Sequence, residues 1–129
     1  MLKEILEELN EKLKSSTSLG KQFEQTINDS YDEFLEEVYN KVGTGYSKKE
    51  LVKDLTSGKN VGVKNINKIL IDILNSKINK IAKKLVSQDV QEDDIYSALD
   101  ELENVYKEDT LIYSVYEEFK SILEKKLNL

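Results

Sequence analysis

Apolar residues recur at helical spacing along most of this chain, and one stretch shows the pattern most clearly. Its apolar positions follow one another in steps of four, three or one, and they are Ile66, Leu70, Ile73, Leu74, Ile78, Ile81 and Leu85. Such steps place all of these side chains on one face of a helix. The pattern therefore predicts a long helix over residues 63–86.

Shorter stripes of the same kind predict further helices on both sides of this one. They cover residues 2–14, 21–42 and 47–57, a segment from about Val90 to Glu108, and a segment from Thr110 to Leu127. The polar run 15–18, followed by Leu19 and Gly20, predicts a break between the first two. Ser47 and Glu50 have the spacing of a capping box at a helix start, and Gly43 stands where a left-handed helix cap belongs.

A sheet is not expected, because the chain has no Pro, only 5 Gly, and little alternation of apolar and polar residues. A length of 129 residues suits one domain. We therefore predict an all-α fold: a single domain over residues 1–129, with five to six antiparallel helices in one bundle around the long helix at about 63–86.

Part of this pattern resembles a histone fold. The segment Ile69–Leu85 resembles its long middle helix, and Val90 with Asp94–Leu99 resembles the loop and third helix that follow. The short helix at 47–57 would then be the first. The basic loop residues with which that family grips phosphate have no counterpart here, so the resemblance implies a way of packing the helices.

Charge is partitioned along the chain, although the net charge is only −6. Residues 1–46 carry 5 Lys and 10 acidic residues, residues 47–86 carry 10 Lys and 3 acidic residues, and residues 87–129 carry 4 Lys and 12 acidic residues. A basic middle segment therefore lies between two acidic flanks. Such a distribution steers charged partners even where no chemical motif is present.

Most enzyme chemistries lack their usual residues here. The chain has no His, no Cys and no Arg, so a histidine base, a thiolate nucleophile and a bidentate phosphate clamp are all absent. No glycine pattern of a phosphate-binding loop occurs. The acidic run Glu92, Asp93 and Asp94 lacks the spacing of a calcium loop and suits a solvated helix start. We expect no enzyme, no catalytic residue, no cofactor and no metal site.

Four lysines near the end of the long helix form the main candidate contact site: Lys77, Lys80, Lys83 and Lys84. One interpretation is structural, because cations stabilise a helix C-terminus and can pair with acidic neighbouring helices. The other is functional, with the lysines contacting an acidic protein or phosphates. Neutralisation within the fold is the leading interpretation.

Two of the seven tyrosines add weak candidates for partner contact. Tyr46 lies in a glycine loop, and Tyr116 stands beside Glu117 and Glu118, so packing does not obviously require either. Four others lie on or beside apolar stripes, where we expect the edge of the core and solvated hydroxyls: Tyr31, Tyr39, Tyr106 and Tyr113.

The sequence thus favours a small, acidic, non-enzymatic protein that acts by binding a protein partner and forms a homodimer. Its lysine-rich and Arg-free composition suits a phage, virus, plasmid or low-GC cell. Two alternatives are nucleic-acid binding through the lysine-rich helix and imitation of DNA by acidic helix faces. No signal peptide and no run of about 20 apolar residues is present, so we expect a soluble protein in the cytoplasm, or in the host cytoplasm if it is viral.

Overall fold

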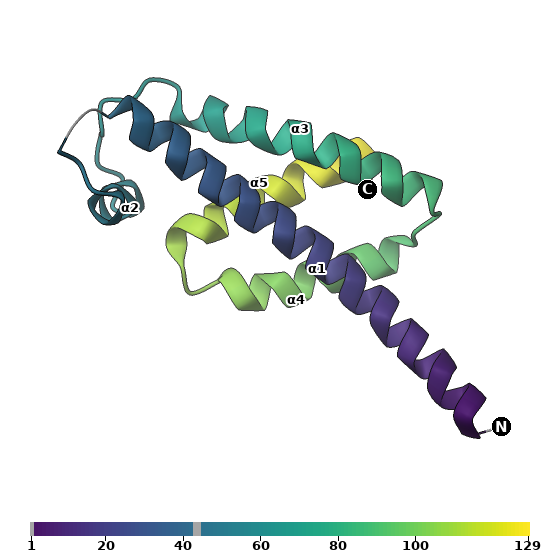
Figure 1. Ribbon diagram of the computed structural model, residues 1–129. Coiled ribbons are helices and arrows are strands. Elements are labelled where there is room, and N and C mark those ends of the chain that lie inside the picture. The colour runs from purple at the N-terminus through teal and green to yellow at the C-terminus, as the bar shows by residue number, and fades with distance from the viewer. Residues whose placement is uncertain (1, 43–44) are drawn as a thin grey trace.

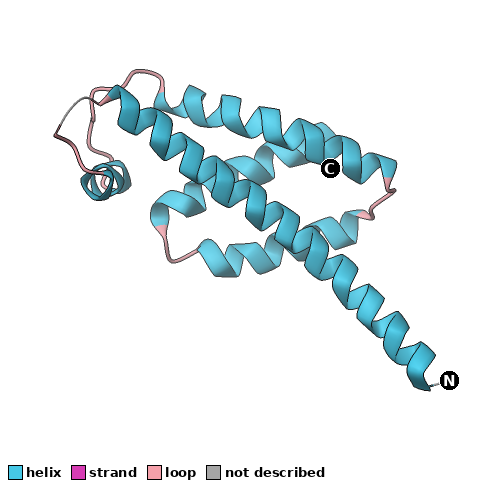
Figure 2. Cartoon of the chain, viewed as in Figure 1, coloured by secondary structure: helices cyan, strands magenta, loops and turns pink. Residues whose placement is uncertain are grey.

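The computed structural model describes the backbone of residues 2–42 and 45–129, and side chains from residue 19 onward within these ranges. The described chain consists of helices and connecting loops without strands (Figure 2), which confirms the all-α prediction. Its helices are α1 (Leu2–Lys41), α2 (Lys48–Thr56), α3 (Ile66–Ser87), α4 (Glu92–Tyr106) and α5 (Thr110–Leu127).

Helix α1 is a single helix of 40 residues, so the predicted break at residues 15–20 is wrong. Ser and Thr are only mildly unfavourable in a helix, and a single Gly costs about 1 kcal/mol relative to Ala. No Pro is present to stop the helix. Leu19 is buried, and a Cβ at Gly20 would lie 3.9 Å from Glu101 of α4, so tertiary packing holds this segment in the helix. The side chains of the predicted stripe at 2–14 lie outside the described set.

The ends of the shorter helices follow local capping rules. Ser47 accepts a hydrogen bond from the backbone N–H of Glu50 at 3.1 Å, which confirms the predicted cap of α2. Asp109 accepts from the backbone N–H of Ile112 at 3.4 Å at the start of α5. Helix α3 starts at Ile66, later than predicted, because Asn65 takes a left-handed conformation with φ 59°. The predicted cap at Gly43 lies outside the described residues.

The four long helices α1, α3, α4 and α5 pack together in one bundle. Figure 1 shows α3 along the top and α4 along the bottom, with α1 crossing in front and α5 behind. Both α1 and α5 contact every other helix, whereas α3 and α4 contact only α1 and α5. The long helix predicted at 63–86 is α3, which packs against both α1 and α5.

This arrangement differs from the packing that the histone resemblance implies. In such a fold the two short helices would lie against the long middle one. Here neither α2 nor α4 contacts α3. Instead, α2 is docked on α1 and α5, with Leu51 fully buried and the Lys48 Nζ atom 2.6 Å from Glu36 Oε2 of α1.

The core lies where α1, α3, α4 and α5 meet. Phe23 of α1 packs edge-on against Phe119 of α5, with ring centroids 5.4 Å apart. Helix α3 adds a row of buried residues four apart, namely Leu70, Leu74 and Ile78. Ser30 of α1 is the one fully buried polar residue among the described side chains, and its hydroxyl has no hydrogen-bond partner.

Candidate functional site

The four candidate lysines lie on the C-terminal half of α3, and the structure divides them into two kinds. Lys77 forms an ion pair with Glu33 of α1 at 3.1 Å, and its side chain is 28% exposed. Lys80, Lys83 and Lys84 are exposed, and no ion pair involves them in the described part of the chain. We call these last three residues the lysine face.

The lysine face extends along one side of α3. With about 100° of rotation per residue, its three side chains fall within an arc of roughly 100°. They point away from the row that contains Leu74 and Ile78, which is buried in the core. Because these cations are close together, exposed and not engaged in an ion pair within the described residues, they are available to an external anion.

Neutralisation of the basic segment by acidic helices is realised only in part. Helix α3 carries five Lys and one Asp, whereas α4 carries six acidic residues and no Lys. These two helices do not contact each other, because α1 and α5 lie between them. The pairing that the sequence suggested is therefore present for Lys77, which pairs with α1, and absent from the lysine face within the described residues. Lys84 does lie in the last turn of α3, where a cation is favourable.

A groove of about 430 Å³ runs between α1 and α3 next to the lysine face. Half-buried Ile69 and Ile73 line it together with acidic groups of both helices, and Lys77 and Lys80 lie among its lining residues. Apolar side chains beside cations suit an amphipathic protein segment better than a bare phosphate chain. The sequence did not reveal this groove, because it depends on how α1 and α3 pack.

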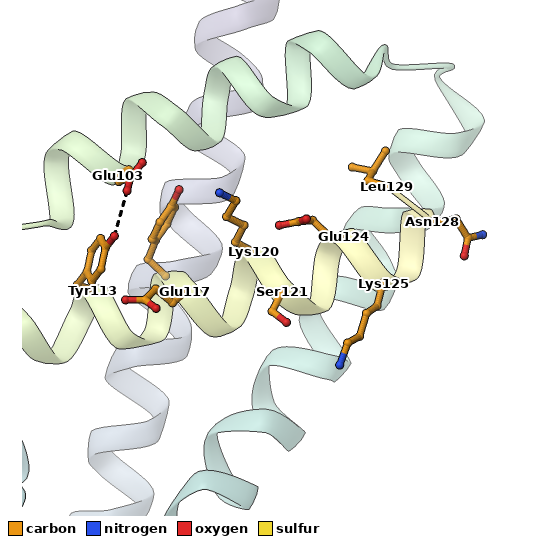
Figure 3. Close-up of a pocket in the computed structure, with 10 residues that line it drawn as sticks. Glu103, Tyr113, Glu117, Lys120, Ser121, Glu124, Lys125, Asn128 and Leu129 are labelled. Atoms are coloured by element: carbon orange, nitrogen blue, oxygen red, sulfur yellow. Dashed lines mark hydrogen bonds between the residues drawn. The ribbon is translucent and has the colours of Figure 1, made fainter.

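A second and larger groove, of about 790 Å³, lies between α4 and α5. Figure 3 shows Lys120 and Glu124 projecting from α5 toward α4, with Glu103 across from them. The Tyr113 hydroxyl donates to Glu103 Oε1 at 3.0 Å, and the Tyr96 hydroxyl donates to Glu124 Oε2 at 3.3 Å. These bonds link α4 to α5 at two points.

The carboxylates also change the acidity of these tyrosines. The hydrogen bond to Glu103 raises the pKa of Tyr113, and burial with the charge of Glu124 raises the pKa of Tyr96. Both phenols are therefore held in their neutral, donating form at physiological pH. Such groups clamp helices together and do not act as general bases.

Tyr116, a predicted contact residue, is a core residue, so that prediction is corrected. It is 1% exposed, and its hydroxyl donates to the Leu99 carbonyl at 2.8 Å. The sequence held the necessary signal, since Tyr116 follows Ile112 by four positions and precedes Phe119 by three. The adjacent pair Glu117 and Glu118 obscured this pattern.

The other tyrosines are more varied than the sequence indicated. Tyr46, the second predicted contact residue, is half-buried and packs against the core cluster. Tyr106 is 5% exposed, and its hydroxyl donates to Asn28 Oδ1 at 3.0 Å rather than to solvent. Burial, together with the charge of Glu24, raises the pKa of Tyr106 to about 12.

The described residues were also considered as a metal site and as membrane-spanning helices. No group of three or more acidic side chains is arranged to hold a metal ion there. In the same part of the chain, no helix combines the length and apolar character required to cross a membrane.

Comparison with known proteins gives no relative from which a role can be transferred. No family model, no curated protein and no solved structure matches this chain. The candidate site therefore depends on the lysine face and the adjoining groove alone.

Proposed function

We propose that this protein acts by binding an acidic protein surface through the lysine face, rather than by catalysis. The supporting observation is that Lys80, Lys83 and Lys84 are exposed and form no ion pair with any described side chain, on a helix that does not contact α4, which carries six acidic residues and no Lys. The adjoining α1–α3 groove offers apolar contact with Ile69 and Ile73.

The residue types set the character of this binding. A lysine ammonium is a compact and strongly hydrated charge without the planar fork of arginine. Contacts made by lysines alone are individually weak and sensitive to salt, so several are needed together. Apolar contact in the groove would supply the part of the affinity that salt does not remove.

The test compares two triple variants that change the net charge equally. In the first, all three residues of the lysine face are replaced by Glu. In the second, three exposed lysines elsewhere are replaced by Glu, namely Lys49, Lys53 and Lys126. Each purified protein is immobilised and exposed to lysate of the native host, and the bound proteins are quantified by mass spectrometry.

The wild type and the control variant are expected to retain the same acidic protein, and the lysine-face variant is expected to lose it. The proposal is wrong if nothing is retained, or if the lysine-face variant retains as much partner as the control. Binding of a DNA duplex, measured in parallel by fluorescence anisotropy, separates the nucleic-acid alternative. Binding to DNA that only the lysine-face variant loses would favour that alternative over a protein partner.

A further inference from the structure

The outer side of α4 presents a surface opposite in charge to the lysine face. Five of its six acidic side chains are exposed, and we call four of them the acidic face: Asp93, Asp94, Asp100 and Glu101. Helix α4 contacts only α1 and α5, and Glu101 lies beside Gly20 of α1 at one border of this face. Figure 1 shows α3 and α4 at opposite edges of the bundle. Each molecule therefore carries a cationic edge and an anionic edge on two helices that do not contact each other.

Each of the two edges also carries a prominent exposed apolar side chain. Val86 follows Lys83 by one helical turn and is 70% exposed, and Val105 follows Glu101 by one turn and is 63% exposed. These are the two most exposed large apolar side chains in the described part of the chain. In a contact between the two edges, these valines would add apolar area beside the complementary charges.

The charged groups on the two edges form rows along their helices. On α4, Asp93 and Glu101 are eight residues apart, which is roughly 12 Å along the helix axis. From Lys80 to Lys84 on α3 the distance along the axis is about 6 Å, so the shorter row fits within the longer one. Two helices laid edge to edge can therefore bring several opposite charges together at once.

We infer that a partner of the lysine face is the acidic face of a second copy of this chain. This inference rests on the proposed function, because it uses the same lysine face and names its partner. The contact joins two different surfaces, so in a pair one copy keeps a free acidic face and the other keeps a free lysine face. A head-to-tail contact of this kind propagates into chains unless the rotation between copies closes a ring.

Salt concentration controls this association. Charges interact over about 10 Å at 0.1 M salt, but over only about 3 Å at 1 M. Sedimentation velocity of the full chain at about 20 mM NaCl should show mass rising with protein concentration. At about 500 mM NaCl the chain should sediment as a monomer.

The decisive experiment uses two reversed variants and their mixture. One carries Lys80→Glu, Lys83→Glu and Lys84→Glu, and the other carries Asp93→Lys, Asp100→Lys and Glu101→Lys. Each variant alone has two edges of like charge and should remain monomeric at low salt. An equimolar mixture restores one native pair of edges and should associate at least to the dimer.

Folding is checked by circular dichroism, since Asp93 lies in the first turn of α4 and stabilises that helix end. A neutral version, Asp93→Asn with Asp100→Asn and Glu101→Gln, keeps the size of each side chain. It should weaken association by at least tenfold if the contact is electrostatic.

Three results would overturn the inference: a wild type that is monomeric at every concentration at low salt, association that either reversed variant retains, or a mixture that fails to associate. If the wild type is monomeric but retains an acidic partner from lysate that the lysine-face variant does not retain, the self-association alone is overturned. If the wild type is monomeric and retains no such partner, the proposed function is overturned as well.

Discussion

Replacing Ser30 with alanine should stabilise this protein, because the substitution removes a buried hydroxyl that has no hydrogen-bond partner. Ser30 is fully buried on the inner side of α1, and its hydroxyl has no hydrogen-bond partner. It stands between Ile27 and Phe34, both of which belong to the core cluster. Folding therefore removes this hydroxyl from water without replacing the lost hydrogen bonds.

The size of the effect follows from three contributions. An unsatisfied buried hydroxyl costs about 1–3 kcal/mol. Alanine also favours a helix over serine by roughly 0.5 kcal/mol. Loss of the dispersion contacts of one oxygen atom opposes these gains, with each contact contributing about 0.1–0.2 kcal/mol. The expected net gain for Ser30→Ala is about 1–2 kcal/mol, which corresponds to several degrees in Tm for a chain of this length.

Urea unfolding followed by circular dichroism measures this gain as a change in the free energy of unfolding. Ser97→Ala is the matched control, because Ser97 is exposed in the interior of α4 and reports helix propensity alone. The denaturant dependence should be equal in all three proteins. The reasoning is refuted if Ser30→Ala destabilises the fold, or if its gain does not exceed that of Ser97→Ala.

Three further predictions concern the packing of α4 against α1 and α5. Tyr116→Phe removes the 2.8 Å hydrogen bond to the Leu99 carbonyl and should lower the free energy of unfolding by about 1–2 kcal/mol in urea; an unchanged midpoint would contradict this. Alkaline pH should destabilise the fold, because Tyr106 has a pKa of about 12 in the folded protein against 10.0 in the unfolded chain. The contribution of Tyr106 to the free energy of unfolding is complete below pH 10 and is lost as the pH rises toward about 12. Absorbance at 295 nm would follow ionisation of the tyrosine, and circular dichroism would follow unfolding. Tyr106→Phe should shift the pH midpoint of alkaline unfolding upward. Gly20→Ala should stabilise α1 by up to about 1 kcal/mol in thermal unfolding, because the new Cβ would meet only Glu101, at 3.9 Å; a loss of stability would indicate a tighter crossing of α1 and α4.

Local sequence signals predicted a helix boundary well where a single capping residue sets it. The spacing of Ser47 and Glu50 identified the start of α2, and its capping hydrogen bond is present. The long apolar stripe identified α3, but its start is delayed by Asn65, which takes a left-handed conformation that Asn adopts more readily than most residues. The polar run before Gly20 was misleading, because contact with α4 outweighs weak local preferences.

The candidate site was harder to predict, because it depends on which helices touch. The lysines and the acidic residues can be assigned to helices from the sequence alone. Whether they neutralise each other depends on the packing, and α1 and α5 separate α3 from α4. Among the described residues, Lys77, which faces Glu33, and Lys48, which faces Glu36, pair with α1 as the pairing argument predicts. Tyr116 shows the opposite error, since its apolar spacing was a better guide than its charged neighbours.

The separation of charge carries an energetic cost that bears on its role. Lys80 lies three and four positions from Lys83 and Lys84, and like charges at these spacings destabilise a helix by a few tenths of a kcal/mol per pair. The acidic residues of α4 add similar repulsion at the opposite edge. Raising the salt concentration should therefore stabilise the isolated fold slightly while it dissolves contacts between copies. These two effects have opposite signs. If added salt raises the free energy of unfolding and also dissociates the copies, the charged edges serve binding rather than stability.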